Sequence, residues 1–488
     1  MRVPTFTCDL SQPPTPFVHV WEHTVGSDHA PITLRADWQR HMRASKLELG
    51  FEHVRFHGLL SDDMGTLIRH EKELRYSFFN IDQIFDFLLS VGVRPFVELG
   101  FMPEALASGD HTVFRYRGNV TPPIDYDAWS LLIRKLIRHW IDRYGHREVS
   151  RWYFEVWNEP NLHHFWTGTQ QEYWALYRHT AEAIKSVDAA LRVGGPATAQ
   201  NAWLADFVEF CELARVPLDF VTTHYYPTDA FGEPGADTET QLAHAPRDVM
   251  RDRAREARQQ VGERALYYTE WNISSNPRDP FHDQPFAAAY ATRTIMNVAD
   301  LVQGYSFWTC SDIFAENYFP STPFHGGFGL LSLHGIPKPV YRAFELLHGL
   351  GTEQYAVEGA HETLDVWVVG DAANVTLLVT NHAQPRHPIA TELVRIVLAH
   401  ASAPNAAGLK RIDDRHANPR RAWTEMGEPE HLIPSEIDYL TAVSRLVREP
   451  LTWRYEAGTL EMDIDLPPYA VAAIRLEGVR TAAQSLNS

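Results

Sequence analysis

The sequence predicts an α/β fold, a (β/α)8 barrel followed by a smaller C-terminal β-sandwich. Over residues 15–350, short apolar runs alternate with amphipathic helical stretches, which is the pattern of a parallel sheet covered by helices. Eight strand–helix pairs can be counted there, and eight parallel strands close into a barrel. After Gly351 the helical periodicity gives way to two-residue alternation punctuated by Gly, Asn and Pro, which predicts the sandwich.

The individual elements follow from periodicity and from start and stop signals. Most expected barrel strands are short aromatic or β-branched runs, and they cover residues 17–21, 51–56, 93–99, 152–158, 192–195, 220–224, 265–269 and 304–308. The expected helices cover residues 36–47, 81–90, 126–144, 170–187, 203–213, 247–261, 286–301 and 340–350. In the third helix, large apolar residues recur at helical spacing from Trp129 to Trp140, and Gly145 ends the pattern. We interpret that aromatic stripe as core.

The domain boundaries follow from this change of pattern, since a chain of 488 residues exceeds the usual single domain. We expect a barrel over residues 15–350 and a β-sandwich accessory domain over residues 351–480. Residues 1–14 are a candidate addition to the sandwich, and residues 481–488 are expected to form a flexible tail. The segment 404–430, rich in Pro, Ala and charge, is expected to be an exposed loop.

Charge and cysteine content narrow the function classes. The formal net charge of -18 disfavours a nucleic-acid partner, because such binding relies on Lys and Arg at phosphates. The three cysteines are widely spaced, which predicts neither a disulfide framework nor a metal knuckle. No stretch has the pattern of a membrane span or a signal peptide, so we expect a cytoplasmic protein with no membrane partner. No HExxH-like spacing occurs, and neither a metal nor another cofactor is expected. A homo-oligomer is left open.

Two strand-end carboxylates stand out. Glu159 follows the aromatic run that begins at Trp152, and Glu270 follows a similar run that begins at Leu266. These strands are the fourth and seventh of the barrel, so both side chains are expected at its C-terminal mouth, facing each other. A lone glutamate at a strand end more often has a structural role, but two in matching settings favour acid/base and nucleophilic work on a glycosidic bond. The rival carboxylates Glu98 and Glu155 are expected to form hydrogen bonds inside the barrel.

Longer motifs carry a resemblance to a known family. The runs Trp157-Asn-Glu-Pro-Asn161 and Thr269-Glu-Trp-Asn272 resemble those of glycoside hydrolases whose catalytic glutamates end strands four and seven. Flanking motifs resemble family 39, the β-xylosidases and α-L-iduronidases: Val25-Gly-Ser-Asp-His-Ala30, Arg55-Phe-His-Gly-Leu-Leu60, Val97-Glu-Leu-Gly-Phe-Met-Pro103, Thr223-His-Tyr-Tyr-Pro227 and Phe307-Trp-Thr-Cys-Ser-Asp312. The match spans most of the barrel, and nothing is recognised between about residues 400 and 450.

The resemblance implies a retaining mechanism with Glu159 as general acid/base and Glu270 as nucleophile, their carboxyl groups about 5–5.5 Å apart. It also implies substrate-binding roles for six further residues: Asn158 at the sugar 2-hydroxyl, His57, His224 and Glu316 at hydroxyls, Tyr226 beside the nucleophile, and Trp308 as the aromatic floor under the ring. From the residues alone, the two histidines could equally be core histidines. Asp28 and His29 resemble a family motif to which no role is assigned.

The substrate class is a small carbohydrate, and its identity can be narrowed further. An iduronate carboxylate calls for a Lys or Arg, whereas the sixth strand is followed by a run from His224 to Asp229 without a basic residue. We therefore favour an exo-acting β-D-xylosidase that releases xylose from non-reducing ends. The alternatives left open are an α-L-iduronidase, an arabinosidase or glucosidase on the same barrel, and a barrel that only binds carbohydrate.

Overall fold

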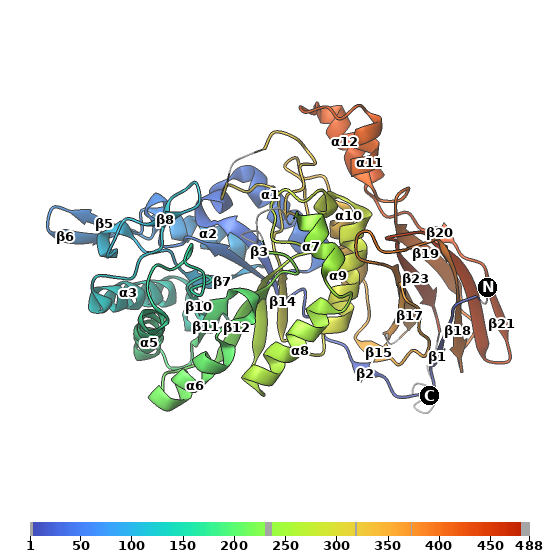
Figure 1. Ribbon diagram of the computed structural model, residues 1–488, viewed down its shortest axis with the longest axis horizontal. Coiled ribbons are helices and arrows are strands. Elements are labelled where there is room, and N and C mark those ends of the chain that lie inside the picture. The colour runs from blue at the N-terminus through green and yellow to red at the C-terminus, as the bar shows by residue number, and fades with distance from the viewer. Residues whose placement is uncertain (1–2, 230–236, 318–319, 372, 480–488) are drawn as a thin grey trace.

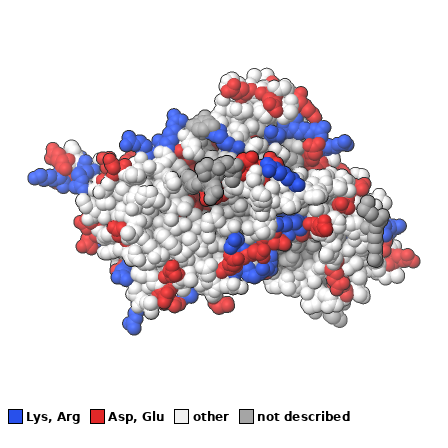
Figure 2. Space-filling model, in the orientation of Figure 1, with Lys and Arg blue, Asp and Glu red and all other residues white. Residues whose placement is uncertain are grey.

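The computed structural model describes residues 3–229, 237–317, 320–371 and 373–479. Figure 1 shows a barrel wrapped by helices, coloured from blue to yellow, beside a β-rich part formed mainly by the orange and red end of the chain. Residues 481–488, the expected tail, lie outside the described residues. Figure 2 shows basic and acidic side chains interspersed on this face of the molecule.

Eight parallel strands close the barrel in the order β3-β4-β7-β10-β11-β12-β13-β14, which confirms the predicted fold class. Their bounds are β3 (Thr24–His29), β4 (His53–His57), β7 (Arg94–Leu99), β10 (Tyr153–Val156), β11 (Arg192–Thr198), β12 (Phe220–Tyr225), β13 (Leu266–Trp271) and β14 (Gly304–Phe307). All except β3 overlap the strands expected from the sequence. Two short hairpins, β5 (Leu67–His70) with β6 (Glu73–Tyr76) and β8 (Thr112–Val113) with β9 (Gly118–Asn119), extend the loops of the barrel.

The expected first strand at residues 17–21 is wrong. That segment is irregular, and the first barrel strand is β3, whose sequence is polar in its second half. The polar residues are buried because other elements bind them: the Trp38 indole donates to Ser27, and the backbone N–H of Ala315 donates to Asp28. Phe17 packs against the core by its aromatic ring rather than as part of the sheet. Hydrophobic patterning therefore missed a strand whose side chains are buried polar groups.

Helices cover the outside of the barrel: α1 (Ala36–Leu49), α2 (Phe79–Ser90), α3 (Tyr126–Tyr144), α4 (His146–Val149), α5 (Gln170–Val187), α6 (Leu204–Ala214), α8 (Val249–Val261), α9 (Pro285–Val298) and α10 (Pro339–His348). The short helix α7 (Thr238–His244) belongs instead to the connection after β12, at the C-terminal end of the barrel. In α3 the side chain of Asp125 caps the N-terminus, and Gly145 follows the last turn at φ 83°. Its apolar stripe, Trp129 to Trp140, is fully buried as predicted. Within the described residues, no helix has the length and apolarity needed to cross a membrane.

Two further sheets face each other in the C-terminal part. The larger contains β2 (Thr15–Pro16), β15 (Glu353–Tyr355), β16 (Leu364–Gly370), β17 (Asn374–Asn381), β23 (Val471–Glu477), β19 (Ala406–Ile412) and β20 (Glu449–Pro450). The smaller contains β1 (Thr5–Asp9), β18 (Glu392–Ala399), β22 (Thr459–Leu466) and β21 (Trp453–Glu456). Apolar side chains of both sheets form one core. Because β1 pairs in parallel with β18, the start of the chain contributes a strand to this part.

The expectation of an exposed loop at residues 404–430 is wrong. The segment contains β19 and α11 (Pro419–Glu425), and α12 (Pro434–Val443) follows it. Trp423 of α11 and Leu440 of α12 are buried against Phe324 and Ile336, which belong to the long connection after β14. The apolar residues of this segment are sparse and widely spaced, so its composition concealed the strand β19 and the helix α11.

A partly buried ion cluster joins the barrel helices to the C-terminal sheets. Arg247 and Arg293 both contact Asp365 of β16, at 2.5 and 3.0 Å. Arg247 also donates to the backbone oxygens of Thr363 and His382. The two parts of the chain are therefore held together by charge-assisted hydrogen bonds as well as by apolar contacts.

We predict that Asp365→Ala lowers the free energy of unfolding by about 2–3 kcal/mol, because two guanidinium groups lose a partly buried acceptor. Urea denaturation followed by fluorescence measures this loss. The matched control is Asp300→Ala, which removes the exposed partner of Arg251 and should cost less than about 1 kcal/mol. Equal losses in the two variants would show that the ion cluster at Asp365 does not stabilise the fold more than an exposed ion pair does.

Candidate active site

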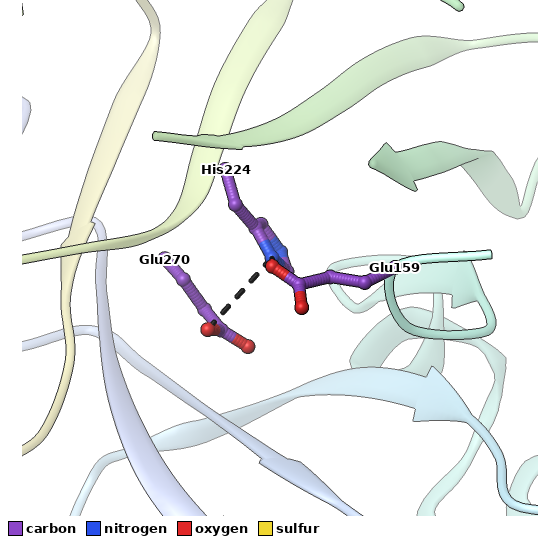
Figure 3. A group of neighbouring side chains, drawn as sticks. All are labelled: Glu159, His224 and Glu270. Carbon is purple, nitrogen blue, oxygen red and sulfur yellow. Dashed lines mark hydrogen bonds and ion pairs between the residues drawn. The ribbon is translucent and has the colours of Figure 1, made fainter. Parts of the chain in front are cut away.

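The two glutamates singled out from the sequence meet at the C-terminal mouth of the barrel. Glu159 follows β10, where Trp157 and Glu159 both have positive φ values, 72° and 44°, that turn the chain sharply. The backbone N–H of Glu159 donates to the carbonyl of Ala197, which fixes this turn. Glu270 lies within β13. One carboxylate oxygen of each glutamate and one ring nitrogen of His224 all lie within 4.8 Å of one another, and the side chains converge in Figure 3.

Arg55 of β4 organises the carboxylates beneath this mouth. Its guanidinium is fully buried and donates to Glu270 Oε1 at 2.8 Å and to Asn158 Oδ1 at 2.9 Å. It also contacts Glu155 at 2.5 Å and Glu98 at 2.9 Å. Glu98 and Glu155 are thus engaged inside the barrel, and neither lines the cavity above them.

The electrostatic surroundings of the two glutamates differ. Burial raises the pKa of Glu159 well above its usual value, and the charge of Glu270 adds to the rise. Burial also raises the pKa of Glu270, but the positive charge of the Arg55 guanidinium opposes that rise. Tyr226 additionally donates its hydroxyl to Glu270 Oε2 at 3.0 Å. These contacts therefore favour the ionised form at Glu270 and the protonated form at Glu159.

The histidines near the pair are neutral. Burial lowers the pKa of His57 to about 4, and it lowers that of His224 well below the usual value. His57 Nδ1 lies 2.6 Å from Glu98, and its Nε2 lies 3.5 Å from Glu270. Both rings therefore act by hydrogen bonding rather than as cations.

A cavity of about 580 Å³ opens above the pair. Seven of the eight residues predicted for the site line it: His57, Asn158, Glu159, Tyr226, Glu270, Trp308 and Glu316. Trp308 packs with Tyr226, Phe314 and Phe328 in an aromatic cluster. His224 is the exception, because it is completely buried behind Glu159, so that its expected contact with a sugar hydroxyl has no support.

Some lining residues were not anticipated. Phe114 and Phe165 form an apolar side of the cavity, and Gln200 and Asp229 are among its polar residues. They come from long βα loops, whose conformation local sequence patterns do not encode. Arg55 was also missed as a site residue, although an arginine in the middle of a strand of buried residues was a usable signal.

Asp28 and His29 of β3 lie beside the site, where Asp28 contacts the loop that carries Glu316. His29 lies between Asp28 and Asp63, at 3.0 and 3.3 Å, and stacks on Tyr116 at 3.9 Å between ring centroids. Burial opposes protonation of His29, but the two aspartates raise its pKa to about 9. Asp28 accepts the backbone N–H of Ala315, so this charged pair fixes the loop that carries Glu316.

Glu159, His224 and Glu270 form the group of potential metal-ligand atoms found among the described residues. The Arg55 guanidinium, 2.8 Å from Glu270, places a positive charge against any bound cation. Both oxygens of Glu270 already accept internal hydrogen bonds. These contacts disfavour a bound cation at this group.

Comparisons with known proteins agree with this geometry. The family model described as glycosyl hydrolases family 39 matches residues 6–459. A beta-xylosidase of Caldicellulosiruptor saccharolyticus is 46% identical over 94% of this chain and 95% of that protein. A beta-xylosidase of Geobacillus stearothermophilus is 37% identical over 94% and 93%. The crystal structure of a monomeric beta-xylosidase from Caulobacter crescentus CB15 has a TM-score of 0.87 at 33% identity, with 97% of this chain and 99% of that chain covered.

The raised pKa of Glu159 predicts a pH-dependent cost to stability. The stability contributed by its protonated form is fully present below the unfolded pKa, about 4.3, and is lost as the pH rises through the folded value. Glu159→Gln stays neutral, so it should raise the free energy of unfolding at pH 8 by about 1 kcal/mol or more and leave it nearly unchanged at pH 4. Urea titrations at both pH values measure the difference.

The control for this prediction is Glu182→Gln on the exposed face of α5, which should change stability by less than about 0.5 kcal/mol at either pH. A stabilisation by Glu159→Gln that is as large at pH 4 as at pH 8 would show that packing, and not the buried carboxyl, is responsible.

Proposed function

Since the chain belongs to glycosyl hydrolase family 39, we propose that it is an exo-acting, retaining β-D-xylosidase that releases D-xylose from the non-reducing ends of β-xylosides and short xylo-oligosaccharides. The relatives of highest identity cited above carry the same activity in their names and match nearly the whole chain. In this proposal Glu270 is the nucleophile and Glu159 the general acid/base.

The observation that carries the proposal is the close approach of the two carboxylates, since one oxygen of Glu159 lies within 4.8 Å of one oxygen of Glu270. Inverting enzymes keep their carboxyl groups about 6.5–9.5 Å apart to admit a water molecule, whereas retaining enzymes keep them about 5–5.5 Å apart. The separation therefore favours direct attack by Glu270 on the anomeric carbon.

The reaction then proceeds in two displacements. Glu270 forms a bond to the anomeric carbon as the glycosidic bond breaks, and Glu159 transfers its proton to the departing oxygen. Glu159, now a carboxylate, takes a proton from water. The water oxygen attacks the anomeric carbon and displaces the carboxylate of Glu270. The contrast in surroundings between the two glutamates suits these roles, because Arg55 and Tyr226 stabilise the anionic Glu270.

The substrate-binding roles follow from which atoms are free. Asn158 Oδ1 accepts from Arg55, which leaves the Asn158 amide nitrogen to donate to the sugar 2-hydroxyl. Trp308 offers a flat apolar surface to the sugar ring. Burial raises the pKa of Glu316 well above its usual value, so that its neutral carboxyl can bind hydroxyls beside His57.

The lining of the cavity favours a neutral sugar over the uronic acid of the alternative, α-L-iduronate. Among the described residues that line it, none is Lys or Arg. Arg55 lies beneath the cavity and is already bound to three carboxylates. A substrate carboxylate would therefore enter a site rich in acidic groups without a cation to pair with.

We predict that Glu270→Ala lowers kcat for an aryl β-D-xyloside by about 10⁴-fold or more, because the covalent step is lost. Azide should restore part of the activity and yield α-xylosyl azide, since it attacks from the side that Glu270 vacates. Product analysis by NMR distinguishes the two azide anomers.

The exposed Glu182→Ala serves as the matched control and should retain the wild-type rate. A near-normal rate in Glu270→Ala would exclude this residue as the nucleophile. Faster hydrolysis of an aryl α-L-iduronide or β-D-glucoside than of the xyloside by the wild-type protein would contradict the substrate assignment.

A further inference from the structure

A chain of hydrogen bonds runs from the barrel interior to Glu159. Glu155 Oε1 lies 2.8 Å from the hydroxyl of Thr269, which lies 3.0 Å from His224 Nε2. His224 Nδ1 in turn lies 2.9 Å from Glu159 Oε1. The first three residues are at most 1% exposed, and of the four only Glu159 lines the cavity. Glu155, Thr269 and His224 can therefore affect the reaction only through Glu159.

Counting hydrogens fixes the direction of these bonds. Glu155 faces the cationic Arg55, which donates from Nε to Glu155 Oε2 at 2.5 Å, so Glu155 is an acceptor. The single hydroxyl hydrogen of Thr269 is therefore donated to Glu155 Oε1. The oxygen of Thr269 can then only accept from His224, which requires the ring proton of His224 to be on Nε2.

A neutral imidazole carries one ring proton, so Nδ1 of His224 presents a lone pair to Glu159. This contact is a hydrogen bond only when Glu159 supplies the proton. An ionised Glu159 would instead place a negatively charged oxygen 2.9 Å from Nδ1, facing the same lone pair. Glu270 Oε2 also lies 3.7 Å from Nδ1. The tautomer of His224 thus favours the acid form of Glu159 over the carboxylate.

We propose that Thr269 is a positioning residue that fixes the Nε2-protonated tautomer of His224 and thereby holds Glu159 in its acid form. This inference rests on the proposed role of Glu159 as the general acid/base. The same contact serves the second displacement, because a carboxylate that receives no hydrogen bond from His224 is a stronger base toward water.

The charged groups around these hydrogen-bonded residues also favour a neutral His224 and a protonated Glu159. Burial lowers the pKa of His224, and the positive charge of Arg55 and any charge on His57 lower it further. Burial, Glu270, Glu98 and Asp229 raise the pKa of Glu159, and Arg55 opposes them. His224 is consequently neutral over the pH range in which Glu159 must hold its proton.

The test uses Thr269→Val, which keeps the shape of the side chain and removes the hydroxyl, and Thr269→Ser, which keeps the hydroxyl. The readout is the alkaline limb of kcat/KM against pH for a phenyl β-D-xyloside, whose poor leaving group needs the acid. We expect the valine variant to shift this limb to lower pH by about one unit, which lowers kcat/KM by roughly tenfold at pH values above the wild-type limb. The serine variant should keep the limb at the wild-type pH.

A 2,4-dinitrophenyl β-D-xyloside provides the internal comparison, because its leaving group departs without protonation. The loss in Thr269→Val should be at least about fivefold smaller on this substrate. An equal loss on both substrates with an unmoved limb would mean that Thr269 is merely structural and would overturn the proposal. Failure of the proposed function is distinguishable, because Glu159→Ala would then keep the wild-type rate on both substrates.

A second measurement needs no variant of Thr269. The ring nitrogens of His224 can be observed by 15N NMR in the wild-type protein and assigned by their loss in His224→Gln. We expect a protonated Nε2 and a bare Nδ1 at neutral pH. A proton on Nδ1 would overturn the proposal, whether or not the valine variant folds.

Discussion

The structure depends on one buried cation. Arg55 is inaccessible to water and binds Glu98, Glu155 and Glu270; among the described residues, no other Lys or Arg forms an ion pair with any of these three. Desolvating this many charges is costly, and their mutual attraction offsets the cost only because the geometry is tight. Of the two central glutamates, Glu270 contacts the guanidinium, whereas no contact between it and Glu159 is found among the described residues. In the proposed mechanism, that asymmetry separates an anionic nucleophile from a protonated acid within a single cavity.

The barrel interior is divided along its axis in a way that serves this arrangement. At the N-terminal end of the strands, Phe96, Tyr153, Phe220 and Tyr267 fill the interior with aromatic rings. At the C-terminal end, the same strands present carboxylates, histidines and threonines that bind one another. The aromatic layer closes one end, so the cavity opens only toward the loops. Strand alternation thus places packing and chemistry on the same elements but at different heights.

Much of the fold could be predicted because it depends on periodicity. In α3 the apolar residues recur at helical spacing, and in β7, β10 and β13 they form short runs; both patterns are visible in the sequence. The strand β3 was missed because its buried residues are polar and satisfied by partners distant in sequence, such as Trp38 and Ala315. The helices α11 and α12 were missed because each contributes few core residues, which pack on each other and on the connection after β14.

The two central glutamates could be predicted from motifs, whereas Arg55, several loop residues that line the cavity and the hydrogen bonds between side chains were not. The motifs around Glu159 and Glu270 identify the pair, whereas the role of His224 behind Glu159 depends on Thr269 and Glu155, which only the closed barrel brings together. The proposed mechanism requires Glu270 to bond to the anomeric carbon while Glu159 protonates the departing oxygen, so that two displacements retain the anomeric configuration. It is tested most directly by following hydrolysis of an aryl β-D-xyloside by 1H NMR at early times. Retention predicts that β-xylose is formed first and mutarotates later; α-xylose as the first product would contradict a double displacement.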